Sequence, residues 1–173
     1  MNAEQMKALQ APVKERYRTD PASALYTMRV EAELRQEKVT CVVKSAHGPI
    51  EAGLHPAAGG PGDFACSGDM LLEALIACAG VTLAAVATAM SISIRGGKLR
   101  AEGDLDFRGT LGVAKEVDIG FKEIRLFIDL DTDAASEQID TLIKLTKRYC
   151  VIYQTLQKPP VMTTTTTRAP QIH

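Results

Sequence analysis

The chain has 173 residues, of which 46% are apolar and 24% charged, and its net charge is −1. These values are typical of one globular domain with its own core. A nearly neutral chain with 5% aromatic residues and no Trp has neither the charge nor the stacking surfaces that favour a nucleic-acid partner or an anionic membrane.

The first 21 residues indicate a cytoplasmic protein with a helical N-terminal extension. They contain no long apolar stretch and no small-residue cleavage site. Met6, Leu9 and Val13 recur at helical spacing, which predicts a short amphipathic helix followed by a turn at Pro21. We assign residues 1–21 to this extension and residues 22–173 to the main domain.

A hairpin and a loop follow. Residues 25–34 alternate between apolar and polar, which predicts a half-buried strand. The polar "RQEK" at 35–38 interrupts the pattern and "VTCVV" at 39–43 returns as a second strand, so Arg35 lies at the hairpin tip. The Gly- and Pro-rich segment up to residue 68 predicts a loop, with a short extended piece near Ile50.

Residues 66–90, "CSGDMLLEALIACAGVTLAAVATAM", predict a long apolar helix whose only charge after Met70 is Glu73. A helix that is apolar all round is buried in protein or in lipid. The charge of Glu73, the weak hydrophobicity of Ala, and neighbouring amphipathic strands that need a core favour a central helix over a membrane span. Its small residues allow close helix-to-helix packing across a dimer.

The C-terminal half alternates again. Residues 99–108 and 121–130 predict antiparallel strands with one wet face. A second helix is expected to begin at Thr132 or Asp133 and to continue past Tyr149 through "CVIYQTL". The β-branched "VMTTTTTR" at 161–168 predicts a last edge strand, so the fold class is α+β.

The cysteines carry the chemistry. Structural disulfides are rare in a reducing compartment, no two cysteines form a C-x-x-C pair, and the histidines show no ligand spacing with them, so we expect neither a metal nor a cofactor. Taken alone, Cys78 in its helix and Cys41 in its strand are small core residues. Cys66 is either a loop cysteine or an alternative resolving thiol.

The motifs "GDMLLEALIACAGVTLAAVA" and "LTKRYCVIYQTL", together with the order of elements from about 22 to 167, resemble the OsmC/Ohr family of osmotically inducible and organic hydroperoxide resistance proteins. The resemblance implies antiparallel sheets wrapped around long central helices in an intertwined homodimer. It also implies a thiol peroxidase, in which Cys78 attacks a hydroperoxide and Cys150, 72 residues later, resolves the sulfenic acid. An external dithiol then regenerates the enzyme.

A peroxidatic thiol must be ionised, and Cys78 lies too far inside its helix for much help from the helix dipole. The resemblance implies that Arg35 supplies the cation, with Arg29 as the fallback; the alternative is that Arg35 is a solvated turn residue. The family's acidic residue, ten positions before the first Cys, is Gly68 here. Asp69 is the candidate orienter of Arg35, although a first-turn acid at a helix start is the simpler interpretation.

The family's Pro after the second Cys is Val151 here, a second departure. Both departures leave other functions open. One is a non-enzymatic protein that binds a small ligand in the same fold, and another is a thiol-redox sensor. The leading hypothesis is the reduction of organic hydroperoxides in an apolar pocket.

Overall fold

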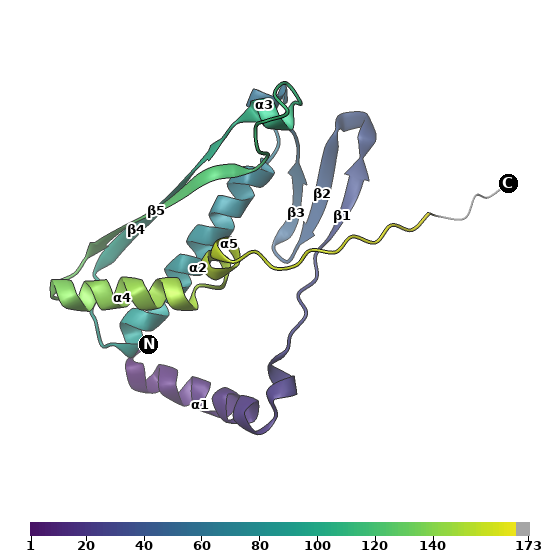
Figure 1. Cartoon of the computed structure of the whole chain (residues 1–173). Coiled ribbons are helices and arrows are strands. Elements are labelled where there is room, and N and C mark those ends of the chain that lie inside the picture. Colours follow the sequence, from purple (N-terminus) through teal and green to yellow (C-terminus); the bar gives the residue numbers. More distant parts are fainter. Residues whose placement is uncertain (169–173) are drawn as a thin grey trace.

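The computed structural model describes residues 1–168 and has a mixed helical and stranded fold in which α2 runs between two small sheets (Figure 1). One sheet has the order β1-β2-β3 and the other is the pair β4-β5. All neighbouring strands are antiparallel. The elements in chain order are α1 (Ala3–Thr19), η1 (Pro21–Ala24), β1 (Glu31–Arg35), η2 (Gln36–Lys38), β2 (Thr40–Ser45), β3 (Gly48–Ala52), η3 (Pro56–Ala58), α2 (Ser67–Ala89), β4 (Gly96–Leu105), α3 (Phe107–Thr110), β5 (Phe121–Asp131), α4 (Ser136–Tyr149) and α5 (Val151–Gln157).

The core forms where α2 crosses the β4-β5 pair and α4. Its buried residues come from the last turns of α2, the segment after it, and the middle of α4, and they are Leu83, Ala87, Ile92 and Leu142. Leu142 has no exposed surface. The prediction of two long antiparallel strands after the apolar helix is confirmed, with Gly96 opposite Asp131 and Leu105 opposite Phe121. The first of them ends earlier than the predicted residue 108, because Asp106 caps the short helix α3 that begins at Phe107.

The hairpin is confirmed, but its first strand is shorter than expected. The strand predicted from residue 25 begins only at Glu31, whose partner is Lys44, and β2 ends one residue later at Ser45. Residues before Glu31 therefore find no backbone partner on β2, and Met28 remains 84% exposed. The extended piece predicted near Ile50 is β3.

The second helix starts later than predicted and ends earlier. Thr132 donates a hydrogen bond to the Ser93 carbonyl and accepts one from the Ala134 amide, while Asp131 and Asp133 pair with Arg95. These contacts tie the end of β5 to the segment before β4, so α4 begins only at Ser136.

The last predicted strand is wrong for the single chain. Residues 161–168 have no regular secondary structure, and Val161 and Met162 are 94% and 90% exposed. A β-branched sequence forms a strand only beside another strand, and none in the described chain lies along this one. The end of the predicted domain, residues 169–173, lies outside the described residues, and its boundary after residue 21 stays a prediction.

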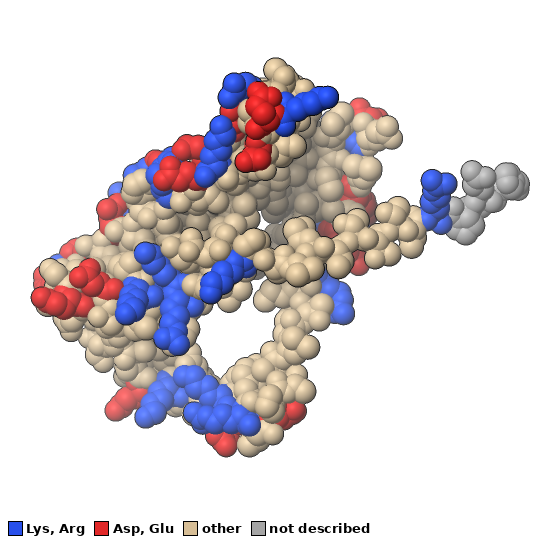
Figure 2. All heavy atoms as spheres, viewed as in Figure 1, with Lys and Arg blue, Asp and Glu red and all other residues tan. Residues whose placement is uncertain are grey.

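Helix α1 is longer than predicted, because it continues through Pro12 to Thr19. It buries none of its residues, and it touches the body through α2. Figure 2 shows lysines and arginines gathered over α1 and the C-terminal end of α4, with acidic residues at the other end of α4, whereas both signs alternate along the edge of β4 and β5. The net charge of −1 therefore conceals one basic face.

Candidate thiol site

Cys78 lies on the flank of the only stripe of α2 that is buried in the single chain. That stripe repeats every four residues and consists of Leu75, Ala79, Leu83 and Ala87. One residue corresponds to about 100° of helix rotation, so Cys78 sits beside Ala79 at the border between the core and the open side of the helix. Its side chain is partly exposed.

A break between α4 and α5 brings the second sulfur to this border. Cys150 ends α4 and starts α5, with an extended backbone at φ −71° and ψ 109°. Its side chain has no exposed surface, and its Sγ accepts a hydrogen bond of 3.4 Å from the Tyr153 amide. The side chains of Cys78 and Cys150 interact, and both are free thiols that are not joined in a disulfide. The prediction of one helix continuing past Tyr149 is therefore wrong, and the break is what points the first amides of α5 at Cys78.

The two thiols are shifted in opposite directions. Burial alone would raise the pKa of Cys78, but hydrogen bonds from the Ile152 amide, the Cys150 thiol, the Val151 amide and the Thr82 hydroxyl outweigh it, and the pKa is lowered. The pKa of Cys150 is raised, first by burial and further by the neighbouring Cys78, against the opposing hydrogen bond from the Tyr153 amide. Cys78 is thus the thiol that ionises first.

Arg35 lies at the end of β1, where its Nη1 is 3.4 Å from the Glu51 carboxylate on β3. Thr40 on β2 donates to the same carboxylate at 2.8 Å and is itself buried. In the single chain Arg35 is not among the groups that shift the pKa of Cys78. Sequence reasoning missed Glu51, and the one signal for it was the β-strand pairing that places it beside Thr40 and Arg35.

Asp69 is exposed in the first turn of α2, and the described residues provide no ion pair for it. The helix begins at Ser67, before Asp69, so Asp69 points away from Cys78 as the helix rotation predicts. A side chain at Gly68 would begin 3.5 Å from Phe121 and 3.7 Å from Leu105, facing the chain's own strands. Cys66, at the N-cap of α2, donates no side-chain cap and contacts neither Cys78 nor Cys150 through any described interaction.

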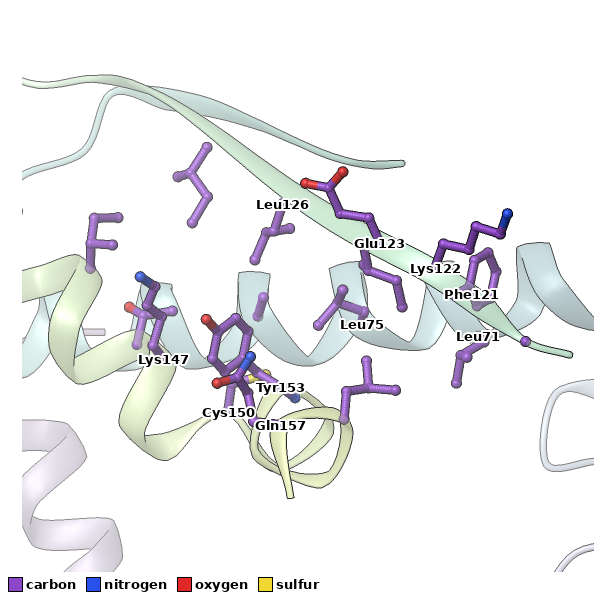
Figure 3. A pocket seen from close by; sticks show the side chains of 17 residues that line it. Leu71, Leu75, Phe121, Lys122, Glu123, Leu126, Lys147, Cys150, Tyr153 and Gln157 are labelled. Carbon is purple, nitrogen blue, oxygen red and sulfur yellow. The ribbon is translucent and has the colours of Figure 1, made fainter. Parts of the chain in front are cut away.

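A cavity of about 830 Å³ lies between α2, β5, α4 and α5. Leu75 on α2 and Leu126 on β5 face each other across it, and Tyr153 rises into it from α5 (Figure 3). Cys150 lies on its wall, whereas Cys78 does not. Buried Thr146 also lines it, and its Oγ1 has no hydrogen-bond partner.

The open side of α2 is apolar as well, and Val81 is 74% exposed. By length and composition α2 is long and apolar enough to cross a membrane, a test that core helices of soluble proteins also pass. Because its buried stripe packs on β4, α4 and α5, α2 is the central helix of this fold. Among residues 1–168, no group of three or more His, Cys, Asp or Glu side chains is placed to hold a metal ion.

The chain has an antiparallel α+β fold with two thiols beside its central helix, and residues 60–165 match the family model described as OsmC-like protein. The chain therefore belongs to the OsmC-like protein family, as the sequence motifs predicted. No curated protein matches it. Membership supports a redox role related to peroxides, and the thiol peroxidases of this family work without a cofactor.

Solved structures show the same fold. The chain is similar to an OsmC-like protein from Mycoplasma pneumoniae, with 19% identity, 78% of this chain and 89% of that chain covered, and a TM-score of 0.64. An organic hydroperoxide resistance protein from Elizabethkingia anophelis gives 20% identity, coverage of 78% and 91%, and a TM-score of 0.62. One from Legionella pneumophila gives 18%, 78% and 91%, and 0.60.

Proposed function

We propose that this protein is a cytoplasmic, homodimeric thiol peroxidase that reduces organic hydroperoxides through Cys78 and Cys150 and is regenerated by an external dithiol. The observation that carries the proposal is the contact between two thiols 72 residues apart, of which one has a lowered and the other a raised pKa. A nucleophile that ionises more readily than the thiol beside it suits a two-cysteine mechanism.

In this mechanism the Cys78 thiolate attacks the outer oxygen of the hydroperoxide. The O–O bond breaks, the alcohol leaves after taking a proton, and Cys78 becomes a sulfenic acid. Cys150 then attacks the Cys78 sulfur, and water leaves with the sulfenic oxygen and the Cys150 proton as the disulfide forms. Oxidation of Cys78 removes the negative charge that helps to raise the pKa of Cys150, so Cys150 ionises more readily at the step that needs it.

Arg35 is assigned the role of activator, supplied to Cys78 by the second copy of the chain. Two exposed apolar surfaces support this assignment: the open side of α2, and the β1 region, where Leu34 is 81% exposed. Covering both in a dimer would bury them and could carry Arg35 to the thiol. Glu51 holds the guanidinium within the chain, and Asp69 stays the candidate orienter in the assembled dimer.

The apolar surroundings of the thiols favour hydroperoxides with a hydrocarbon group over hydrogen peroxide. Each buried CH₂ contributes roughly 0.8 kcal/mol to binding that hydrogen peroxide cannot obtain. The expected preference is therefore visible in KM and grows with the size of the organic group.

The test is the consumption of cumene hydroperoxide and hydrogen peroxide with an alkyl dithiol as reductant. Wild type and Cys41→Ser should both consume cumene hydroperoxide faster than hydrogen peroxide. Cys78→Ser should consume neither. Cys41 is the matched control because it is also a partly buried thiol. Turnover that persists in Cys78→Ser would refute the mechanism, and inactive wild type that still binds the alcohol product would favour the non-enzymatic alternative.

A further inference from the structure

Three polar side chains meet on one face of the sheet formed by β1, β2 and β3 (Figure 1). Arg35 on β1 lies directly opposite Thr40 on β2. Glu51 on β3 lies opposite Val42, two residues further along β2. Residues two apart on a strand point to the same face, so Thr40 and Glu51 are diagonal neighbours, and both can reach Arg35.

One oxygen of the Glu51 carboxylate accepts from both neighbours. Thr40 donates its hydroxyl to Oε1 at 2.8 Å, and Nη1 of Arg35 lies 3.4 Å from the same oxygen. Thr40 makes the shorter bond and is 3% exposed, whereas the side chains of Arg35 and Glu51 are 41% and 30% exposed. The buried hydroxyl therefore fixes the carboxylate, and the carboxylate fixes the more exposed guanidinium.

The remaining charges on this face leave the arrangement undisturbed. Lys44, the next cation along the same face of β2, pairs with Glu33 at 2.8 Å, so it does not compete for Glu51. Within residues 1–168, Arg35 donates to Glu51 through Nη1 and has no acceptor at Nε or Nη2. An arginine held at one nitrogen keeps its other N–H groups for a ligand.

The turn between β1 and β2 points to the same contact. Val39, directly before Thr40, has a left-handed backbone with φ 54° and ψ 42°. A β-branched residue is strained in this region, and burial of the Val39 side chain does not compensate, because it is 62% exposed. The contacts that hold the turn belong to the next residue, so the strained turn is what brings Thr40 opposite Arg35.

We propose that Thr40 is a positioning residue for Arg35: its hydroxyl orients the Glu51 carboxylate, which holds the guanidinium in the direction that the proposed reaction uses. Thr40 and Glu51 together replace the acid that is absent at Gly68, where a side chain would begin 3.5 Å from Phe121 and face the chain's own strands. The inference rests on the role of Arg35 in the proposed function, but not on the reaction between the two thiols.

The first experiment measures the hold on Arg35 without any peroxide. Phenylglyoxal modifies free guanidinium groups, and peptide mass spectrometry compares Arg35 with Arg29 of the same sample, which is exposed in the segment before β1. The ratio of Arg35 to Arg29 modification should rise about fivefold in Thr40→Val, the upper end for a partly exposed ion pair. Thr40→Ser, which keeps the hydroxyl, should recover most of the wild-type ratio. Equal ratios in wild type and Thr40→Val would overturn the inference.

A second background separates positioning from a packing role. Glu51→Gln removes the carboxylate charge, so adding Thr40→Val to it should leave the modification ratio within about twofold. A Thr40 side chain that only packs in the sheet would change the ratio by the same factor in both backgrounds, and that result would contradict the proposal. Urea titration establishes that each variant is folded during labelling, and Thr40→Ala replaces Thr40→Val if the latter does not fold.

The same variants test the link to turnover. In Thr40→Val, kcat/KM for cumene hydroperoxide should fall about fivefold, while iodoacetamide labelling of Cys78 keeps its rate, because the first amides of α5 stabilise the Cys78 thiolate. Slower labelling of Cys78 would overturn the inference, since the effect would then act on the sulfur. Looser Arg35 with unchanged turnover would sink the role of Arg35 in the proposed function together with this inference, whereas an Arg35 that Thr40→Val does not loosen would overturn the inference alone.

Discussion

Replacing Val151 with Pro removes one of the amides that stabilise the Cys78 thiolate. Val151 is the first residue of α5, where Pro is well tolerated, and Cys150 before it already has the extended backbone that a following Pro prefers. Its side chain is 68% exposed, so little packing is lost. The variant therefore deletes a single hydrogen-bond donor to Cys78 and changes little else.

The magnitude follows from the donor that is lost. A hydrogen bond to a charged group is worth about 1.5 kcal/mol at the low end of its range, and about 1.4 kcal/mol corresponds to a factor of ten in an ionisation equilibrium. The fraction of Cys78 that is ionised, and with it the rate of alkylation at pH below its pKa, should fall about tenfold in Val151→Pro. At high pH, where the thiol is fully ionised, the rates of the two proteins should converge.

The assay is the rate of iodoacetamide labelling of Cys78 as a function of pH, followed on the Cys78 peptide by mass spectrometry. Val151→Ala is the matched control, because it shortens the side chain and keeps the amide. If Val151→Pro and Val151→Ala gave the same pH profile, the amide would not stabilise the thiolate, and the account of the low pKa given by the helix break would be wrong.

Four further outcomes follow from the same structure. Leu142→Ala should lower the free energy of unfolding by about 3 kcal/mol in a urea titration, since Leu142 is fully buried. Val81→Glu should convert the dimer to a monomer in sedimentation; a monomeric wild type would contradict the proposed assembly. The stability of wild type relative to Cys78→Ala should rise between the lowered pKa of Cys78 and its unfolded value near 9.0, and should be lost as the pH falls through that lowered pKa; a flat difference would contradict the shift. Glu51→Gln should slow peroxide reduction more than Asp69→Asn if Glu51 holds the guanidinium in the working enzyme, and the reverse order would favour Asp69.

The order of the main strands and the central helix was predictable because it follows from the periodicity of apolar residues in the sequence. Alternation at 99–108 and 121–130 predicted β4 and β5, and the run of small apolar residues after Met70 predicted the central helix. The pairing of Cys78 with Cys150 came from the family resemblance and not from any pattern in either segment. A contact between residues 72 positions apart leaves no local trace in the sequence.

The incorrect predictions share one physical cause: whether a strand or a helix start forms depends on the tertiary contacts around it. The segments 25–30 and 161–168 have strand-like sequences, but the described chain offers them no partner strand. The late start of α4 was hidden for the same reason, because the bond of Thr132 to Ser93 and the pairing of Arg95 with the end of β5 are tertiary contacts. A strong cap residue predicts a helix start only when no such contact competes for it.

The source of the lowered pKa of Cys78 was also missed, and the reason bears on the proposed mechanism. Sequence reasoning asked for a cation, because Cys78 is far from the start of its own helix. The single chain instead uses the first amides of α5, which become available only because the backbone turns at Cys150. The same turn buries the Cys150 sulfur against the cavity and raises its pKa. One break between two helices therefore accounts for the opposite pKa shifts of the two thiols. In the proposed mechanism, the role of Arg35 then lies with the peroxide oxygen more than with the ionisation of the sulfur.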